Sequence, residues 1–414
     1  MNPSEVLRIV DAIHRDKKID KSIVIAGIES ALVTAARKHF GEDALLSIII
    51  DPETGEMSGS CDGVLLTQEE LEQTGRIDAQ TAKQVMIQKI REAERDSLYE
   101  QLIEDMDQMI TGIVQKVEGS TLILSLGNNI EAILPRSEKI PGDLYHIGDR
   151  VRAVIVDVRK SGTRVKVVVS RTRPLFVKRL FEQEVPEIAD GTIEVKEISR
   201  EPGYRTKIAV ASIDPRIESK GACVGIRGSR IKNVNKELGN ERVDVVQWSD
   251  DMQVFIPNAL QPAEVEEVIL CSMLGRAVVL VKPDQRSLAI GRKGQNVRLA
   301  SKLCGWDIDV RTREDLENVL ETTLGGYLEL EGMTDELADL LVAEGFLSFD
   351  DLSIIEPDDL MSLGNLDEET AAHIIEQAEE RAEEEENQKN EAGNEVRDNE
   401  VRSNEESAED AEGE

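Results

Sequence analysis

A Gly-x-x-Gly turn that occurs twice, in similar surroundings, limits the possible folds of this chain more than any other feature. The first turn lies in GACVGIRGSRIKNVNKELGN and the second in LAIGRKGQNVRLASKLCG. Each turn follows β-rich runs and leads into a helix and then a strand, RVDVVQW in one copy and WDIDVRT in the other. The repeat predicts two small α/β units that pack as one body. In the second unit, AEVEEVILCSML is predicted to be a helix before the strand AVVLVKP.

Glycine in these turns has a chemical rationale. A loop that lets a phosphodiester backbone lie against its own peptide groups has no room for a Cβ. The helix that follows presents free N–H groups and the positive end of its dipole. KH domains bind about four nucleotides of single-stranded RNA in this way. The candidate RNA-binding residues are therefore Gly225, Ile226, Arg227, Gly228, Arg230 and Lys232 in the first copy, and Gly291, Arg292, Lys293, Gly294, Gln295, Asn296 and Arg298 in the second.

A single turn of this kind could also be a helix connection that simply needs small residues, so the repetition with basic flanks is what favours RNA binding. Trp248 and Trp306 lie at or beside predicted strands, where core packing is favoured over base stacking. Other apolar residues follow each turn at helical spacing and are expected in the core. They are Ile231, Val234, Leu238, Val297, Ala300 and Cys304.

The periodicity differs upstream of the repeat. Residues 107–175 contain five short β-rich runs, ITGIVQKV, STLILSL, NIEAILP, RVRAVIVDV and RVKVVVS, separated by turn signals. They predict a five-stranded OB-type barrel, which either spaces its neighbours or, by analogy with other OB barrels, contacts RNA. Residues 1–106 are predicted to contain two helices, a strand at ALLSIII and a long closing helix.

The net charge of −34 argues against nucleic-acid binding until its distribution is considered. Residues 314–414 carry 35 acidic and four basic residues, whereas residues 191–313 carry 20 basic and 16 acidic ones. Residues 329–380 are predicted to form several short helices that resemble helix-hairpin-helix units. With 18 acidic and no basic residues in 314–375, they would repel phosphate, which favours a protein partner or a basic surface of the same chain. Two roles for the acidic segment stay open, a polyanion that covers the RNA-binding face and a solubilising tail.

Several classes of function are disfavoured. No apolar run reaches the roughly 18 residues of a membrane span, and the N-terminus lacks a signal-peptide core, so a soluble, cytoplasmic protein without membrane contact is expected. The four cysteines and four histidines are scattered, so no disulfide, metal site or cofactor is expected. Walker A, GxGxxG and GxSxG motifs are absent. The chain is therefore predicted to have no catalytic residues and not to be an enzyme.

Long stretches resemble, in order, the NusA family of bacterial transcription elongation, termination and antitermination factors. They are RIDAQTAKQVMIQKIREAER, GDRVRAVIVDV, VVVSRTRPLFVKRLFEQEVPEIADGTIEVKEISREPGYRTKIAV, GACVGIRGSRI and AIGRKGQNVRLASKLCGWDI. The chain departs from the family where Glu218-Ser219-Lys220 replaces the usual Asp-Pro-Val before GACVG. A phosphorolytic RNA exonuclease also joins KH and barrel domains, but it carries large catalytic domains ahead of them. A translation-associated RNA-binding protein is the other alternative.

The resemblance implies a multidomain α+β monomer that binds RNA polymerase and nascent single-stranded RNA and affects pausing, termination and antitermination. Other transcription factors are implied as partners of the acidic region. The implied domains are an N-terminal polymerase-binding domain (1–106), an S1-type OB barrel (107–175), a first KH domain (176–255), a second KH domain (256–318), an acidic helical repeat-like module (319–380) and a disordered acidic tail (381–414).

Overall fold

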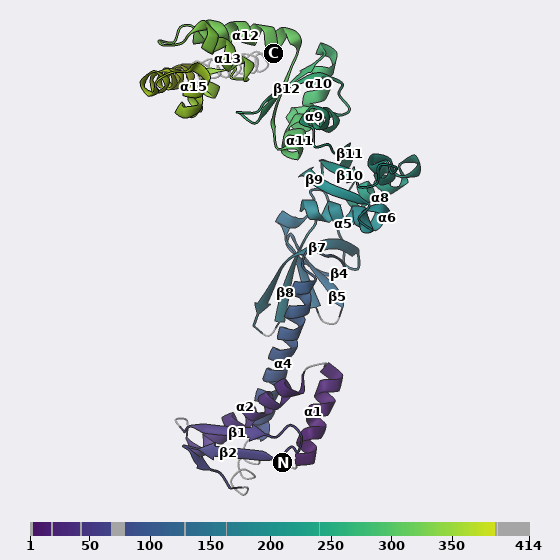
Figure 1. Ribbon diagram of the computed structural model, residues 1–414. Coiled ribbons are helices and arrows are strands. Elements are labelled where there is room, and N and C mark those ends of the chain that lie inside the picture. The colour runs from purple at the N-terminus through teal and green to yellow at the C-terminus, as the bar shows by residue number, and fades with distance from the viewer. Residues whose placement is uncertain are drawn as a thin grey trace, which may run out of the picture. The chain divides into compact units, whose positions relative to one another are not determined.

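The computed structural model describes residues 3–17, 20–41, 44–67, 79–127, 130–162, 164–239, 241–385 and 387. The chain divides into two compact units, Met1–Leu180 and Phe181–Glu414 (Figure 1). Within the described ranges, no helix is both long and apolar enough to cross a membrane.

The N-terminal region packs helices against a small antiparallel sheet. Val10, Ile28 and Ile48 lie in its buried core. The Asp20 carboxylate accepts a hydrogen bond from the Ser22 N–H and so caps the second helix. The predicted helices and the strand at ALLSIII are confirmed. The elements are α1 (Pro3–Lys17), α2 (Lys21–Phe40), β1 (Leu46–Ile50), β2 (Met57–Cys61), β3 (Val64–Leu65) and α4 (Ala79–Glu104).

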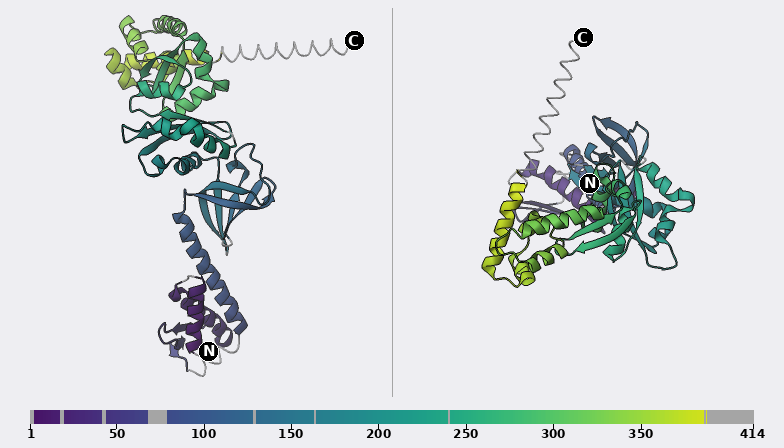
Figure 2. Two further views of the ribbon diagram at one scale, coloured as in Figure 1. Left: turned by 90° about the vertical axis from the view of Figure 1, so that its right-hand side faces the viewer. Right: turned by 90° about the horizontal axis from the view of Figure 1, so that it is seen from above.

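The five predicted strands close into a barrel (Figure 2). Their order around the barrel is β4-β5-β6-β8-β7. In β8, Val165, Val167 and Val169 are buried, while Arg164 before them and Lys166 between the first two are exposed, as the period of a strand with one buried face requires. The OB-type barrel is therefore confirmed. Its elements are β4 (Met109–Glu118), β5 (Thr121–Gly127), β6 (Ile130–Leu134), η1 (Arg136–Glu138), β7 (Arg150–Ser161) and β8 (Arg164–Ser170).

Helix α4 connects the N-terminal region to the barrel (Figure 1). It packs on α2 at one end, and at the other its Leu98, Tyr99 and Leu102 join the core of the barrel. Lys160 forms an ion pair of 2.7 Å with Asp96 on this helix. The barrel is thus attached by apolar packing as well as by the chain itself.

Two KH domains follow, each with a three-stranded sheet in which one pair of strands is antiparallel and the other parallel. Pro186 separates the two helices that lead into the first domain, α5 (Pro174–Glu184) and α6 (Pro186–Ala189). The first domain continues with β9 (Ile193–Glu201), β10 (Arg205–Ser212), α7 (Ser219–Val224), η2 (Ile226–Gly228), α8 (Ser229–Glu237) and β11 (Arg242–Gln247). The second contains α9 (Met252–Leu260), β12 (Val265–Cys271), β13 (Arg276–Val281), α10 (Pro283–Ile290), η3 (Arg292–Gly294), α11 (Gln295–Cys304) and β14 (Asp307–Arg311).

The prediction of a helix at AEVEEVILCSML is wrong, because this segment contains the strand β12. The strand pairs antiparallel with β13, with Val268 opposite Val279 and Ile269 opposite Val278. An irregularity in the register between Val265 and Glu267 leaves two successive glutamates exposed. This bulge breaks the alternation that would have identified a strand from the sequence.

The boundary expected between the two KH domains, at residues 255 and 256, falls inside α9. Phe255, Ile256 and Ala259 of this helix share one buried cluster with Val279 of β13. We therefore propose that α9 as a whole belongs to the second KH domain.

Helices α9 and α11 lie between the two sheets. The same cluster contains Ala209 and Val246 from the first sheet and Ala277, Val279 and Ile308 from the second. The second KH domain thus covers the face of the first sheet that faces away from α7, and the two domains share a core. This confirms the prediction that the two KH domains pack as one body.

One charged residue lies at this junction. Lys207 of β10 is fully buried, with its Nζ 3.4 Å from the Gln261 carbonyl oxygen and 3.8 Å from Asp244 Oδ2. Burial lowers the pKa of Lys207 to about 8, and the attraction of Asp244 offsets only part of this effect. The folded chain therefore releases this proton at a lower pH than the unfolded chain does.

Between pH 8 and 10.5 the Lys207 ammonium is deprotonated in the folded chain but still protonated in the unfolded chain. The contribution of Lys207 to the free energy of unfolding should therefore rise with pH across that window. We expect the unfolding free energy of the wild type, relative to Lys207→Met, to increase by about 2–3 kcal/mol between pH 7 and 10. Denaturant unfolding followed by tryptophan fluorescence suits this test, since Trp248 and Trp306 both pack on the shared core. Exposed Lys236 provides the control, because the unfolding free energy of the wild type relative to Lys236→Met should not change with pH. If the value relative to Lys207→Met were also independent of pH, the pKa of Lys207 would not be lowered by folding.

The C-terminal helices, residues 313–385, cover the other face of the second sheet. Leu316, Val319, Leu320 and Leu347 from these helices and their connections pack on the sheet residues Cys271, Val278 and Leu280, whereas α10 and α11 pack on its opposite face. The first of the C-terminal helices is α12 (Arg313–Tyr327). The short helices predicted within 329–380 are confirmed, and they are α13 (Asp335–Ala343), α14 (Phe349–Ser353), α15 (Pro357–Gly364) and a last helix over 368–385.

A close backbone approach and an ion pair hold these helices on the sheet. A Cβ on Gly345, whose φ is +94°, would lie 2.0 Å from the Cys271 sulfur. Arg276 Nη1 of β13 lies 2.8 Å from Asp351 Oδ2, whose carboxylate is buried. The acidic residues up to 385 therefore lie behind the second sheet and do not cover the GxxG loops, which contradicts the first of the two roles considered for this part of the chain.

The prediction that a disordered tail begins at 381 is wrong for its first residues. The last helix continues to residue 385, and Arg381 forms an ion pair of 3.2 Å with Glu329. Residues 386 and 388–414 of the predicted tail lie outside the described residues.

Gly345→Ala should weaken the packing of the C-terminal helices on the second sheet, because the added methyl group would clash with Cys271. The positive φ at this position costs an alanine about 1–2 kcal/mol in addition. Maleimide labelling of buried Cys271, located by peptide mass spectrometry, should accelerate at least about 10-fold. Gly325→Ala in α12, where a Cβ meets nothing within 4 Å, should leave this rate unchanged or lower it. Equal rates for both variants would show that the close approach does not hold the helices in place.

Candidate nucleic-acid interface

The two GxxG loops have the same backbone conformation. Gly225 and Gly291 have φ/ψ of 75°/174° and 75°/175°. Arg227 and Lys293 occupy the left-handed region at 54°/26° and 54°/33°. Gly228 and Gly294 follow at 75°/21° and 70°/14°. The repeat seen in the sequence therefore extends to the torsion angles, although the two residues between the glycines differ.

The two glycines of each loop are needed for different reasons. The first glycine of each loop has backbone angles that are essentially restricted to glycine, and a Cβ there would lie 2.8 Å from Arg230 Cγ or Asn296 Cβ. The second glycine is left-handed, and a Cβ on Gly294 would meet nothing within 4 Å. The first position is needed for the fold, whereas the second leaves open space beside the peptide backbone.

Arg230 and Asn296 close the loops from equivalent positions, five residues after the first glycine. Arg230 Nη1 donates to the Ala222 carbonyl at 2.7 Å. Asn296 Nδ2 donates to the Ala289 and Leu260 carbonyls at 3.0 and 2.9 Å and is fully buried. Its side chain cannot reach a ligand, so the prediction that Asn296 contacts RNA is contradicted by its burial. It is a structural residue that fixes the end of α10.

The two loops and the start of α8 present four basic side chains and one apolar side chain. Arg227 and Lys232 are exposed in the first domain, and Arg292 and Lys293 in the second. Ile226 is 86% exposed at the tip of the first loop. Within the described ranges, none of the four cations forms an ion pair. Of the predicted basic residues, these are the ones whose charge is available to a phosphate.

The remaining predicted residues have carboxylate partners. Arg230 lies 2.9 Å from Glu187, while Gln295 and Arg298 both donate to Glu201. Partial burial raises the pKa of Glu201, but hydrogen bonds from Gln295 and Arg298 outweigh it, so its pKa lies below the usual value. Sequence reasoning missed both carboxylates, since they lie 43 and 97 residues from their arginines and no local motif marks them.

The apolar residues and cysteines around the loops belong to the core, as expected. Val234, Leu238, Ala300 and Cys304 are buried, while Ile231 and Val297 are half-buried. Trp248 and Trp306 pack against the shared core. Burial raises the pKa of the Cys223 and Cys304 thiols to about 12, which leaves both as thiols of low reactivity at neutral pH.

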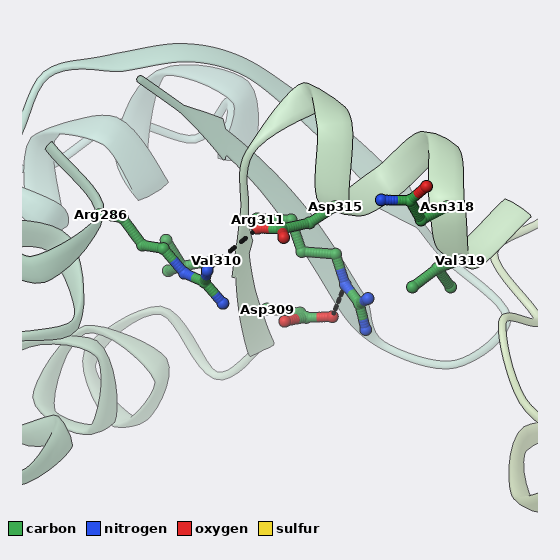
Figure 3. Close-up of a pocket in the computed structure, with 7 residues that line it drawn as sticks. All are labelled: Arg286, Asp309, Val310, Arg311, Asp315, Asn318 and Val319. Atoms are coloured by element: carbon green, nitrogen blue, oxygen red, sulfur yellow. Dashed lines mark hydrogen bonds and ion pairs between the residues drawn. The ribbon is translucent and has the colours of Figure 1, made fainter. Parts of the chain in front are cut away.

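A separate hollow of about 360 Å³ contains two more arginines but offers no available positive charge. Arg286 points toward Asp315 at 3.2 Å, and Arg311 toward Asp309 at 2.6 Å (Figure 3). Each arginine there is neutralised by the chain itself. The exposed cations of the GxxG loops are therefore the better candidate for nucleic-acid binding.

Comparison with known families agrees with this architecture. The chain matches the NusA N-terminal domain over residues 5–61 and 62–96 and the S1 RNA binding domain over 106–170. It matches the NusA-like first KH domain over 171–248 and the NusA-like second KH domain over 252–318.

Two curated relatives are similar over most of their length. The transcription termination/antitermination protein NusA of Bacillus subtilis is 38% identical over 344 residues, which cover 75% of this chain and 92% of that protein. The protein of the same name from Halalkalibacterium halodurans is 36% identical over 362 residues, covering 80% and 93%.

Asn296→Ala should destabilise the second KH domain by about 1–3 kcal/mol, because it leaves buried carbonyl groups without their donor. Denaturant unfolding monitored by tryptophan fluorescence measures this cost. Asn233→Ala is the matched control on α8, where the exposed amide donates, among the described residues, to the Glu184 carboxylate alone and the expected change is within about 0.5 kcal/mol. Equal costs for the two variants would contradict a structural role for Asn296.

Proposed function

Because this chain belongs to the NusA family of transcription termination/antitermination proteins, we propose that it binds both RNA polymerase and the emerging transcript. By doing so it modulates pausing, termination and antitermination, without catalysing a reaction. The observation that carries the RNA part of this proposal is the pair of GxxG loops with one backbone conformation and exposed cations on both.

Each loop supplies what a phosphate group needs. The glycine peptides leave space for the sugar-phosphate backbone, and the N-terminal N–H groups of α8 and α11 follow directly. Exposed Arg227 and Lys293 occupy the same left-handed position in their loops, so each copy carries a cation at the same point. Contacts of this kind fix the strand without selecting a sequence.

The number of exposed cations sets an expectation for salt dependence. Each phosphate neutralised on a single strand contributes about −0.7 to the slope of log K against log salt. If Arg227, Lys232, Arg292 and Lys293 each bind one phosphate, the two loops account for a slope of about −3. Contacts made by the barrel add to this value.

The barrel supports phosphate contact more than base stacking. Arg150, Arg152 and Lys166 are exposed on its strands. Tyr145 is half-buried, and its hydroxyl donates to Asp143 at 2.7 Å. Because its one accessible aromatic ring is held in this way, we propose that the barrel contacts mainly phosphate and ribose.

Polymerase binding is assigned to the N-terminal region because that region matches the NusA N-terminal domain. Its small sheet exposes the apolar side chains of Ile49, Val64 and Leu65, and Leu45 just before β1 is also exposed. Where exposed apolar side chains form a patch, they are common at protein interfaces. The proposal therefore separates the two binding partners, with polymerase at the N-terminal region and RNA at the barrel and KH domains.

Gly228→Asp combined with Gly294→Asp tests the RNA interface. Both positions are open and left-handed, a conformation that Asp tolerates better than most residues, so the fold should persist. A carboxylate there would occupy the phosphate position and repel it. We expect affinity for single-stranded RNA to fall at least 10-fold in a filter-binding or anisotropy assay, while binding to purified core RNA polymerase is unchanged.

The matched control is Gly228→Asn combined with Gly294→Asn, which has nearly the same shape without the charge and should lose less affinity. Tryptophan fluorescence of each variant verifies that the KH cores are intact. Unchanged RNA affinity in the Asp variant would overturn the assignment of the loops. Degradation of RNA in the presence of phosphate would instead support the exonuclease alternative.

A further inference from the structure

One difference between the two KH domains lies at a pair of equivalent positions on the helices after the loops. Lys232 and Arg298 each lie four residues after the second glycine of their loop, on α8 and α11. Lys232 is exposed and, among the described residues, has no carboxylate partner. Arg298 is held by Glu201, which belongs to the first KH domain. Two cations that occupy the same place in the sequence repeat therefore have different surroundings.

Glu201 binds the beginning of α11 through two side chains. Its Oε2 accepts from Gln295 Nε2 at 2.6 Å, and its Oε1 accepts from Arg298 Nε at 2.8 Å and lies 2.7 Å from Nη2. Arg298 Nη1 in turn donates to the carbonyl oxygen of Lys293 at 3.3 Å. The guanidinium thus connects a carboxylate of the first domain to the left-handed residue of the second GxxG loop.

The backbone that carries Glu201 is itself firmly held. The preceding residue, Arg200, forms a bidentate pair with Glu241, with both contacts at 2.9 Å and both side chains almost completely buried. Glu241 also accepts from the Gly203 N–H at 2.8 Å. A buried, fully hydrogen-bonded pair of this kind restricts local motion, so Glu201 is a fixed point for the loop of the next domain.

We propose that Glu201 and Arg298 are a positioning pair that holds the second GxxG loop at a set place relative to the first KH domain, and that Arg298 does not bind phosphate. The inference rests on the proposed RNA binding by the loops. A carboxylate within 2.7 Å already neutralises the Arg298 guanidinium and would repel an approaching phosphate. The pair improves binding because a strand that reaches both loops meets them already arranged, which lowers the ordering cost of the second contact.

Salt dependence separates positioning from phosphate binding. Glu201→Ala and Arg298→Ala should each weaken binding of single-stranded RNA by about 5- to 10-fold, and the double variant should be no weaker than either one, because both remove the same connection. The slope of log K against log salt should stay at the wild-type value in all three. Lys232→Ala is the matched control, and it should make the slope shallower by about 0.7.

Hydrogen exchange in the free protein gives a second measurement that needs no RNA. The amides of Gly294 and Gln295 should exchange at least about 5-fold faster in Glu201→Ala and Arg298→Ala, but not in Lys232→Ala. Arg298→Lys, which can keep the ion pair, should retain part of the protection.

Three results would overturn the proposal. They are a shallower salt slope in Arg298→Ala, tighter RNA binding in Glu201→Ala, and unchanged exchange in both variants. If RNA binding by the loops fails instead, the wild type and the Gly228→Asp, Gly294→Asp variant bind RNA equally, while the exchange measurement still reports on the pair.

Discussion

The left-handed backbone of the two GxxG loops is the constraint on which the proposed RNA interface depends. The first glycine of each loop adopts angles closed to other residues, and the space beside it is filled by a side chain from the following helix. Arginine performs this task in one domain and asparagine in the other, with both side chains donating to carbonyl groups at the end of the preceding helix. Two different side chains therefore stabilise the same loop conformation in the two domains. It leaves the peptide groups of the loop next to open space, where an extended nucleic-acid backbone fits.

The helices that pack on the two KH sheets hold the two loops at fixed positions relative to each other. Helices α9 and α11 fill the space between the first and second sheets, and the C-terminal helices cover the remaining face of the second. Strand β13 is consequently buried on both sides, which explains its uninterrupted apolar run. Polar side chains then tie particular points together, with Glu201 and Arg298 joining the KH domains and Arg276 and Asp351 joining the second sheet to the acidic helices. The strongly acidic helices are thereby kept behind the sheet, away from the exposed cations.

The sequence predicted the parts of this arrangement that depend on neighbouring residues. The barrel was predictable because its five β-rich runs are short and are separated by turn signals, and the loops because all their essential residues lie within a few positions. Strand β12 was not predictable, since a bulge places Glu266 and Glu267 on the exposed side and gives the segment a helical period. Nor were the roles of Asn296 and Arg298, which depend on partners 36 and 97 residues away. The sequence thus predicted which residues belong to the loops. Only the tertiary structure shows which of them are buried and structural and which are exposed to a ligand.

If one RNA strand lies against both loops, single-stranded RNA bound to the full chain should protect both loops from hydrogen exchange. We expect slower exchange in residues 226–229 and 292–295 together, with no change in α12 to α15. Protection of the C-terminal helices, or of fewer than both loops, would show that the strand does not lie against both.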